Sequence, residues 1–346
     1  MLKSKLYSPE YRSMWDEYVD NHFQGSLFHT RLWQETVKAV FGHSEHSIML
    51  LDNKDGRPVV KGLIPLFRIR SFLFGDYLVS VPFAEQGGPL ADHESLRIRL
   101  VDLAGEKLKK NNLDYLEMRN VDPLPDLLCK DLYYGFQREI LSDLEDNLMA
   151  IPRKSRRMVR QGMKNNLQIA VGSHLLPEFY AIMARNFHGL GTPIFPYSWF
   201  SGLMESFQEN CLLLLVKDEK GNHIAGVMSF FYKNRVMPYY AGSLVEYRNL
   251  APNDFMYWKL MEYAWEKGSR IFDFGRSKIG TGSFRFKTHW GFEPRSLAYQ
   301  YVLHKKDELP DLSPNNPKYQ SKIKTWQRMP LSLTKIIGPR ISRYLC

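Results

Sequence analysis

The stretch IFDFGRSKIGTGSFRFKTHWGFEP, residues 271–294, decides how the fold of this chain is interpreted. It predicts a buried strand at residues 271–274, a polar glycine-containing loop at 275–282, and then a short helix that carries Lys287. Gly291 follows where a helix C-terminus favours positive φ. Such a unit places a cation and loop hydroxyls at the carboxyl end of a strand, where α/β folds build their sites. We therefore expect a catalytic site here.

Composition is typical of a cytoplasmic protein without a metal centre. The chain has 346 residues and is 44% hydrophobic, which is enough for two domains with their own cores. Its cysteines, Cys129, Cys211 and Cys346, lie far apart, and no HExxH or CxxC spacing occurs. The first 22 residues lack the apolar core of a signal peptide, and the longest aliphatic run, residues 212–216, is too short to cross a bilayer.

The net charge of +10 comes from two places. Residues 151–164 hold six basic side chains and no acidic one, and residues 318–346 hold seven and again no acidic one. Without these segments the remainder is slightly acidic. Each basic segment therefore either binds an anionic partner or is simply a solvent-exposed surface.

The pattern of helices and strands occurs twice along the chain. We expect an α/β fold with domains at residues 1–146 and 147–305, followed by a basic amphipathic tail at 306–346. In the first half the predicted helices are 10–22, 30–41 and 95–110, and the predicted strands are 47–51, 59–68 and 115–119. In the second half the helices are 153–164, 177–187, 197–208 and 254–267, and the strands are 168–171, 211–217, 224–232, 235–242, 271–274 and two more through 302.

The order of elements in the second half is that of an acyltransferase fold of the GNAT type. In that fold the loop before the central helix normally carries glycines whose amides bind the pyrophosphate of coenzyme A. Here the loop reads SLVEYRNLAPND, residues 243–254, with no glycine and with the acidic Glu246. We do not expect a pyrophosphate site in it.

Several motifs carry a family resemblance: PNDFMYWKLMEYAWEKG (252–268), FDFGRS (272–277), FRFKTHWGF (284–292), FHTRLW (28–33) and the pair Gly87–Gly88. With these the chain resembles the Fem family of peptidoglycan-bridge transferases. The resemblance implies two tandem GNAT-like domains and transfer of an aminoacyl group from aminoacyl-tRNA. The sequence Gly191-Thr192-Pro193 and the tail WQRMPLSLTKIIGP (326–339) are similar to Fem-related proteins of envelope and exopolysaccharide gene clusters.

The resemblance also implies the main catalytic residue. Phe286 and Lys287 match a phenylalanine and lysine of the family, in which the lysine assists catalysis. A fixed ammonium in a poorly hydrated pocket would stabilise the negative charge that develops in acyl transfer. Phe286 and Trp290 would shape and dry this pocket. The alternative is a solvated lysine on a surface helix.

Arg276 and Ser277 end the predicted strand where a substrate should lie. Arginine there would bind a phosphate or carboxylate through two N–H groups. The alternative is an ion pair with Asp273, which we interpret as a structural residue that sets the loop.

The helix at 153–164 carries a basic stripe of Arg153, Arg157, Arg160 and Lys164 by the three-and-four spacing. It would bind a nucleotide-sugar diphosphate, a lipid phosphate or the acceptor stem of tRNA, or else it is a solvated face. We choose Arg157 as its binding residue.

Two further segments are candidates for substrate binding. The loop at 188–196, with His188, Gly191 and Thr192, either covers the acceptor or is a packed loop. Tyr240 lies on a strand near the point where GNAT-like folds seat the acyl group, or it is a core aromatic residue.

The tail mixes aliphatic residues with its cations. That composition is typical of a segment on an anionic membrane, so peripheral membrane contact through residues 318–346 is one expectation. Packing against the first domain is the other.

These features predict an acyltransferase that joins an activated donor to an amine of an envelope saccharide or peptide precursor. No nucleophile–base arrangement indicates a covalent intermediate, so direct attack by the amine is expected. We expect no bound cofactor, and the donor is aminoacyl-tRNA or acyl-CoA. An alternative enzyme is an acyl-CoA-dependent N- or O-acetyltransferase of polysaccharide precursors. An alternative of another class is a non-catalytic scaffold at the membrane surface.

Overall fold

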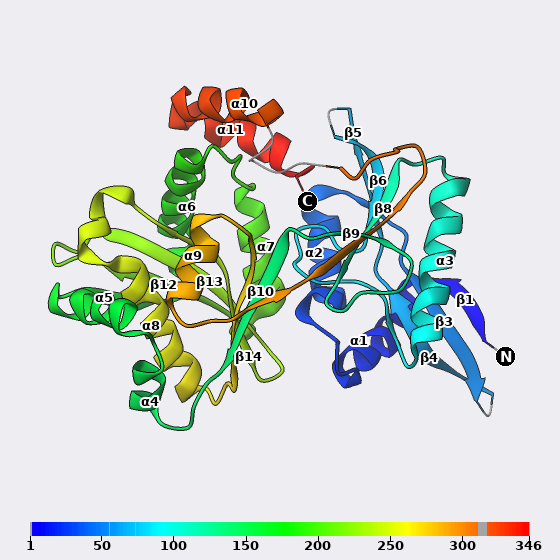
Figure 1. Cartoon of the computed structure of the whole chain (residues 1–346), viewed down its shortest axis with the longest axis horizontal. Coiled ribbons are helices and arrows are strands. Elements are labelled where there is room, and N and C mark those ends of the chain that lie inside the picture. Colours follow the sequence, from blue (N-terminus) through cyan, green and yellow to red (C-terminus); the bar gives the residue numbers. More distant parts are fainter. Residues whose placement is uncertain (1, 55, 73, 311–316, 346) are drawn as a thin grey trace. The chain divides into compact units, whose positions relative to one another are not determined.

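The computed structural model of the chain describes residues 2–54, 56–72, 74–310 and 317–345 (Figure 1). Contacts between residues divide the chain into two compact units. Unit 1 contains Met1–Tyr133, Ser296–Asp311 and Arg343–Cys346, and unit 2 contains Tyr134–Arg295 and Leu312–Ser342. This division differs from the predicted domains 1–146, 147–305 and 306–346, because each unit takes one strand from the other half of the sequence.

Unit 1 is built from sheets and helices that alternate along the chain. One sheet has the order β1-β3-β4-β7 and another the order β2-β5-β6-β8-β17-β9. A core of aliphatic residues, among them Leu50, Ile64 and Leu116, lies beneath helix α3. The strands are β1 (Lys3–Leu6), β2 (Ser44–Glu45), β3 (Ile48–Lys54), β4 (Arg57–Ile64), β5 (Phe67–Ser71), β6 (Gly75–Val79), β7 (Leu90–Ala91), β8 (Tyr115–Asn120) and β9 (Leu128–Lys130), and the helices are α1 (Arg12–Asn21), α2 (Arg31–Phe41) and α3 (Glu94–Lys110).

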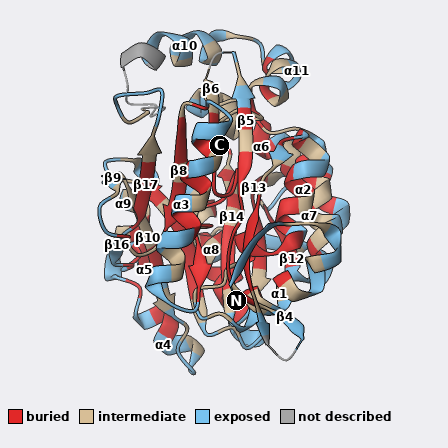
Figure 2. Ribbon diagram, turned by 90° about the vertical axis from the view of Figure 1, so that its right-hand side faces the viewer, coloured by how far each residue is buried: buried red, intermediate tan, exposed pale blue. Residues whose placement is uncertain are grey.

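Strand β17 (Ala298–Leu303) belongs to unit 1, although it comes from the end of the second half. It pairs antiparallel with β8 and with β9, beside which Figure 2 labels it. Its Gln300 is buried, accepts a hydrogen bond from the Asn120 amide at 2.8 Å, and exchanges hydrogen bonds with the backbone of Leu124 at 2.7 and 2.8 Å. The predicted second domain, 147–305, includes this strand, whereas contacts assign it to unit 1, because local pattern does not specify a distant partner.

Unit 2 is built on a sheet of order β11-β12-β13-β14-β15-β10-β16. Strands β11 to β14 pair antiparallel, whereas β14 and β15 run parallel and pair at Arg235–Ile271 and Val236–Phe272. Because these pairs lie at the start of both strands, β14 and β15 diverge toward their carboxyl ends. The strands are β11 (Gln168–Val171), β12 (Cys211–Lys217), β13 (His223–Tyr232), β14 (Arg235–Ser243), β15 (Ile271–Lys278), β10 (Tyr133–Glu139) and β16 (Pro294–Ser296).

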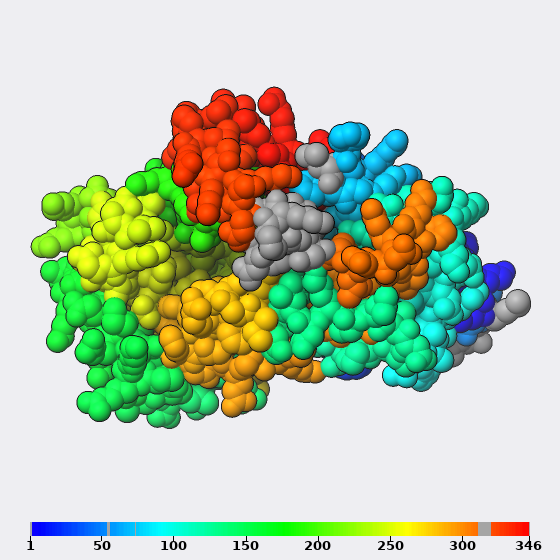
Figure 3. Space-filling model, turned by 45° about the horizontal axis from the view of Figure 1, so that its top comes forward, coloured from blue at the N-terminus to red at the C-terminus, as the bar shows by residue number. Residues whose placement is uncertain are grey.

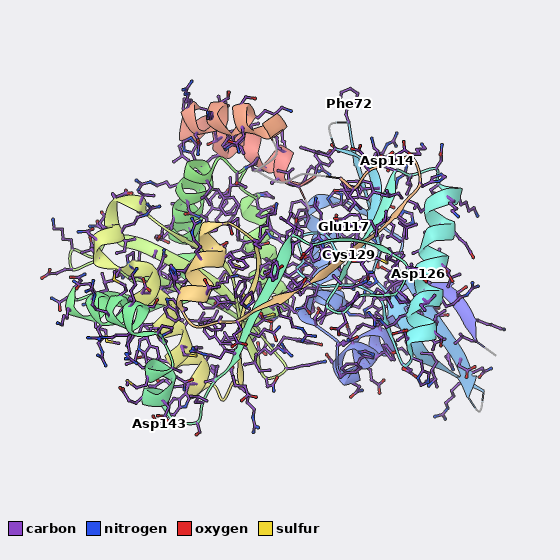
Figure 4. The ribbon with its side chains drawn as sticks, viewed as in Figure 1. Phe72, Asp114, Glu117, Asp126, Cys129 and Asp143 are labelled. Carbon is purple, nitrogen blue, oxygen red and sulfur yellow. The ribbon has the colours of Figure 1, made fainter. Side chains whose placement is uncertain are left out.

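Strand β10 is the contribution of the first half to unit 2. It lies between β15 and β16, and the amide of its Gln137 donates to Asp273 of β15 at 2.9 Å. The sequence analysis did not predict this strand. The predicted boundary after residue 146 therefore comes after a strand that belongs to unit 2. It also falls inside the short helix α4 (Leu144–Met149), which is capped by Asp143, labelled in Figure 4.

Helices cover both faces of the unit 2 sheet. The strand β12 is buried along almost its whole length, as a continuous CLLLLV run predicts for a central strand (Figure 2). On one face of the sheet, Leu212 and Leu214 pack in a core with α5 (Arg153–Lys164) and α8 (Pro252–Glu266). On the other face lies α6 (Leu176–Leu190), whose Phe179 packs close to Gly226 and Leu215. Helix α7 (Tyr197–Phe207) also packs on β12.

The tail forms the helices α10 (Pro317–Arg328) and α11 (Leu331–Ser342), both of which pack on α6 (Figure 1). The expectation that the tail packs on the first domain is wrong for these helices, which belong to unit 2; its last residues, from Arg343, belong to unit 1. Part of the predicted linker, residues 311–316, lies outside the described residues. Among the helices that are described, none is both long and apolar enough to cross a membrane.

Candidate functional site

Strand β15 and helix α9 (Gly282–His289) form the unit that the sequence predicted, with a different boundary. The strand continues through Lys278, so the predicted loop at 275–282 shrinks to the turn at 279–281. Thr281 caps the helix by accepting the backbone N–H of Phe284, and Gly291 after it has φ +81°. The strand is longer than predicted because Gly275 bends it without ending it.

Gly275 is a left-handed residue inside the strand, with φ +65°. Glycine adopts this conformation without the Cβ clash of other residues. The bend lets the buried carboxylate of Asp273 accept the N–H of Gly275 at 2.9 Å. Asp273 also accepts from Gln137 of β10, so it fixes the bend from two sides.

Lys287 points inward from α9 and is 8% exposed. Its ammonium donates to the carbonyls of Gly275 at 3.1 Å and Arg276 at 3.0 Å, and it lies 5.3 Å from the ring centre of Phe136 and 5.9 Å from that of Phe274. Carbonyl dipoles and ring faces both stabilise a buried cation. The alternative of a solvated surface lysine is therefore wrong in its geometry, whereas the catalytic role stays a prediction.

Arg276 and Ser277 lie next to this ammonium on β15. Arg276 is partly buried, and Ser277 is 5% exposed. The hydroxyl of Ser277 has no hydrogen-bond partner among the residues that the structure describes. Buried hydroxyls are usually paired, so this orphan, one residue after a carbonyl that binds Lys287, marks a position where a ligand group could bind.

Phe286 and Trp290 form an aromatic wall on the same helix. Their ring centres are 5.8 Å apart, and Tyr257 of α8 packs against both. Trp290 is fully buried, and its indole N–H donates to Asp254 at 2.9 Å. This hydrogen bond ties α9 to the N-terminal turn of α8.

Asp254 gives the site a pH dependence. Burial raises the pKa of this carboxyl above its ordinary value of 3.8, although the Trp290 N–H opposes the shift. The unfolded chain therefore releases this proton at lower pH than the folded protein, and stability is lost as pH rises from about 3.8 through the raised pKa. In Asp254→Asn an amide oxygen keeps the acceptor without the charge. We expect its free energy of unfolding, relative to wild type, to increase with pH across this window in urea titrations; a constant difference would contradict this.

Arg157 lies on α5, whose N-terminus adjoins α9. The Ser155 hydroxyl donates to the carbonyl of His289 at 2.8 Å, and a Cβ at Gly291 would lie 3.0 Å from Pro152. The buried face of α5 packs on α8, and the predicted basic stripe is exposed. Within the described ranges, no ion pair to a carboxylate is made by its members Arg153, Arg157, Arg160 and Lys164.

The other predicted residues lie in a different part of unit 2. Tyr240 is 8% exposed and accepts the indole N–H of Trp199 at 2.8 Å within an aromatic cluster. His188 is in the last turn of α6, and Gly191 ends that helix with φ +72°. Gly191 and Thr192 adjoin α10, because a Cβ at Gly191 would lie 2.4 Å from Ile323. Substrate binding by Tyr240, Gly191 and Thr192 stays a prediction.

The connection from β14 to α8 has no glycine nest. It contains the short 3₁₀ helix η5 (Val245–Leu250), in which the amides of Tyr247 and Ala251 bond to carbonyls of the same segment. Pro252 begins α8 without an N–H, and the Asp254 carboxylate lies in its first turn. Carboxylate at a helix N-terminus occupies the place of an anionic ligand.

Sequence reasoning missed the residues that enclose the site from other elements. Phe136 and Gln137 come from β10, and Asp254 and Tyr257 come from α8. The aromatic run YYGFQRE of β10 is a strand signal that could have been recognised. The pairing of this strand with β15 could not have been recognised, because the sequence around a strand does not specify a partner far along the chain. In the part of the chain that is described, no cluster of three metal-ligating side chains occurs.

The family comparison agrees with this geometry. Residues 149–288 match the family model described as acetyltransferase (GNAT) domain. Over this segment the chain is similar to GNAT acetyltransferase domains. It includes the diverging strands β14 and β15, the helix α8 and the lysine of α9.

Two known relatives match a part of the chain. A lipid II:glycine glycyltransferase of Staphylococcus haemolyticus is 29% identical over 100 residues, which cover 26% of this chain and 24% of that protein. The corresponding protein of Staphylococcus saprophyticus is 31% identical over 94 residues, covering 25% and 23%. The chain thus matches only about a quarter of the length of these relatives.

Solved structures show the fold of both units. The crystal structure of FemX has a TM-score of 0.64 at 16% identity and covers 92% of this chain and 99% of its own. A tandem GNAT protein from the clavulanic acid biosynthesis pathway has a TM-score of 0.53 at 12% identity, covering 89% and 100%. The predicted fold of two tandem GNAT-like domains and the predicted likeness to Fem-type transferases are confirmed.

Proposed function

We propose that this protein is an acyltransferase that moves an aminoacyl group from aminoacyl-tRNA to an amine of an envelope precursor of the peptidoglycan type. The observation that carries the proposal is the buried ammonium of Lys287, which is held by carbonyls of β15 beyond the point where this strand diverges from β14. The glycyltransferase relatives, whose name specifies lipid II, support the acceptor class. An amine-bearing exopolysaccharide precursor would be attacked in the same way.

The chemistry follows from the charge that develops in the reaction. The amine attacks the ester carbonyl, a C–N bond forms, the ester C–O bond breaks, and the proton of the amine passes to the leaving ribose oxygen. Negative charge grows first on the carbonyl oxygen and then on the leaving oxygen. Lys287 stabilises this charge, the Ser277 hydroxyl binds a polar group of a substrate, and Phe286 and Trp290 exclude water.

The start of α8 supports tRNA over acyl-CoA as donor. A pyrophosphate at that position would be repelled by the Asp254 carboxylate. It would also find few free donors, because Pro252 has no N–H and the amides of η5 already bond to backbone carbonyls. Glu246, which pairs with Arg185, adds a second acid to the same connection. A donor that needs no pyrophosphate nest fits this surface better.

The basic stripe of α5 supports the same donor. Its exposed cations lie on a helix of 12 residues, about 18 Å long, that begins beside the C-terminus of α9. RNA phosphates would follow this helix while the aminoacyl end reaches Lys287.

Arg157→Glu tests the stripe. We expect the KM for aminoacyl-tRNA to rise about fivefold to tenfold and the slope of log affinity against log salt to fall by about 1, because one phosphate contact is lost. The value of kcat should stay unchanged. The matched control is Arg270→Glu, an exposed arginine at the opposite end of β15, which should behave as wild type. Equal effects of both substitutions would exclude a specific role for the stripe.

The proposal as a whole is tested by offering the purified protein labelled aminoacyl-tRNA or labelled acetyl-CoA, each with lipid II. Label that reaches lipid II from the tRNA, and that ribonuclease pretreatment abolishes, is the expected result. Transfer from acetyl-CoA instead would show that the donor is acyl-CoA, while the protein would still be an acyltransferase. Absence of transfer from both donors to lipid II and to amine-bearing saccharide precursors would overturn the proposal.

A further inference from the structure

Helix α11 buries an unusual set of residues. Thr334, Gly338 and Ser342, spaced four apart, form its buried line, and Gly338 lies so close to the backbone of Ile194 that a Cβ would be 3.1 Å from its nitrogen. These small side chains let α11 approach unit 2 closely. The large aliphatic residues Leu331, Ile337 and Ile341 are only partly buried, and Leu333 and Ile336 are exposed.

The opposite face of α11 is aliphatic and exposed. Ile336 is 61% exposed and Leu333 is 40% exposed. Together with Arg340 they lie roughly 150° around the helix from the buried line, at 100° per residue. A helix that only packed on unit 2 would have the reverse arrangement, because burying aliphatic surface is what stabilises such packing.

Helix α10 adds cations to the same region, and the end of α6 adds another exposed aliphatic residue. The side chain of Gln327 donates to the carbonyl of Gly189, and His188 bonds to the carbonyl of Met329, which holds the connection between the helices against the end of α6. Leu190, beside these contacts, is 63% exposed. Five exposed cations accompany it on the two helices: Lys322, Lys324, Arg328, Lys335 and Arg340.

The charge of this surface has one sign. Residues 317–345 contain no aspartate or glutamate. Figure 3, in which α10 and α11 are the red and orange-red atoms, shows both helices on the outer face of the molecule. We call the surface formed by Leu190, Leu333, Ile336 and the five cations the tail surface.

We propose that the tail surface docks on an anionic lipid bilayer, with Ile336 and Leu333 inserted at the level of the headgroups and the cations placed against lipid phosphates. A nucleic acid would account for the cations but not for exposed aliphatic residues. A second copy of the chain would account for the aliphatic residues but would bring like charges together. A bilayer with anionic lipids satisfies both features.

This inference goes beyond the proposed reaction and does not rest on it. The docked protein would remain peripheral, since the helices lie along the surface and do not cross the bilayer. Docking would raise the local concentration of any acceptor that is itself anchored in the membrane.

The test is flotation of the full chain with vesicles, with neither donor nor acceptor present. We expect binding to vesicles of phosphatidylcholine with phosphatidylglycerol at least tenfold tighter than to phosphatidylcholine alone. Ile336→Glu should weaken binding at least tenfold. The double variant Lys335→Gln/Arg340→Gln should weaken it about fivefold per charge and respond less to salt.

Matched controls come from unit 1. Leu128→Glu replaces a leucine that is 52% exposed, and Lys109→Gln/Lys110→Gln removes two exposed cations from α3. These should bind as wild type, and circular dichroism should show all variants folded. Equal binding by Ile336→Glu and Leu128→Glu would overturn the proposal, as would a dimer that Ile336→Glu dissociates or a preference for RNA over anionic vesicles. Failure of acyl transfer leaves this result untouched, because no substrate is present.

Discussion

Lys287→Met is expected to lower kcat for acyl transfer by about 10²–10³-fold, the usual effect of removing one group that stabilises an oxyanion. Methionine keeps most of the volume of the side chain and removes the ammonium. KM should change little, because the charge that Lys287 stabilises develops only in the transition state. The measurement is steady-state transfer of label with saturating donor and acceptor.

Structural damage must be separated from lost chemistry in this variant. The substitution leaves the carbonyls of Gly275 and Arg276 without their donor, which destabilises the protein by about 1–3 kcal/mol. Thermal unfolding followed by circular dichroism reports that loss independently of activity. Lys259→Met removes a partly buried lysine from α8, where it pairs with Glu262, and serves as the matched control. If Lys287→Met retains kcat within threefold, the lysine only supports the bend of β15.

Trp290→Ala is expected to lower the free energy of unfolding by about 3–5 kcal/mol. The indole is fully buried and packs against Phe274, Phe286 and Tyr257, so the substitution leaves a cavity between α9, α8 and β15. Loss of the cavity wall also frees α9, and the Lys287 ammonium with it. Urea unfolding followed by far-UV circular dichroism measures this effect.

Trp290→Phe separates packing from hydrogen bonding. Phenylalanine fills most of the space but offers no N–H to Asp254, which is then left as a poorly paired, partly buried carboxylate. We expect a loss of about 1–3 kcal/mol at neutral pH that shrinks as the solution is acidified and Asp254 is protonated. A loss in Trp290→Ala no greater than that in Trp290→Phe would show that packing against this indole contributes little.

The sequence was sufficient for the parts of the site that lie close together along the chain. The strand, turn and helix of residues 271–291 follow from hydrophobic pattern, a threonine cap and Gly291, and their residues meet because few positions separate them. The enclosure of Lys287 was expected from the apolar neighbours on the same helix. The continuation of the strand beyond Gly275 was not expected from the sequence, because a glycine at such a position is equally typical of a loop.

The exchange of strands could not be predicted in the same way. β10 and β17 are short, and each has a pattern that would fit either sheet. What selects their partners is the whole set of side chains around them, such as Gln137 against Asp273 and Gln300 against Asn120. The inward-facing small residues of α11 are a similar case, since amphipathic pattern alone assigns its aliphatic residues to the packed side.

The position of β17 at residues 298–303 has a consequence for the order of events on the ribosome. The sheet of unit 1 is complete only when this strand is inserted between β8 and β9, so the amino-terminal half cannot finish folding when its own residues emerge. At about 5–20 residues per second, the nascent chain waits roughly 10–40 s between the synthesis of β8 and that of β17. During this interval the edge of β8 that later receives β17 is unpaired, and an unpaired strand edge is a template for pairing with another chain.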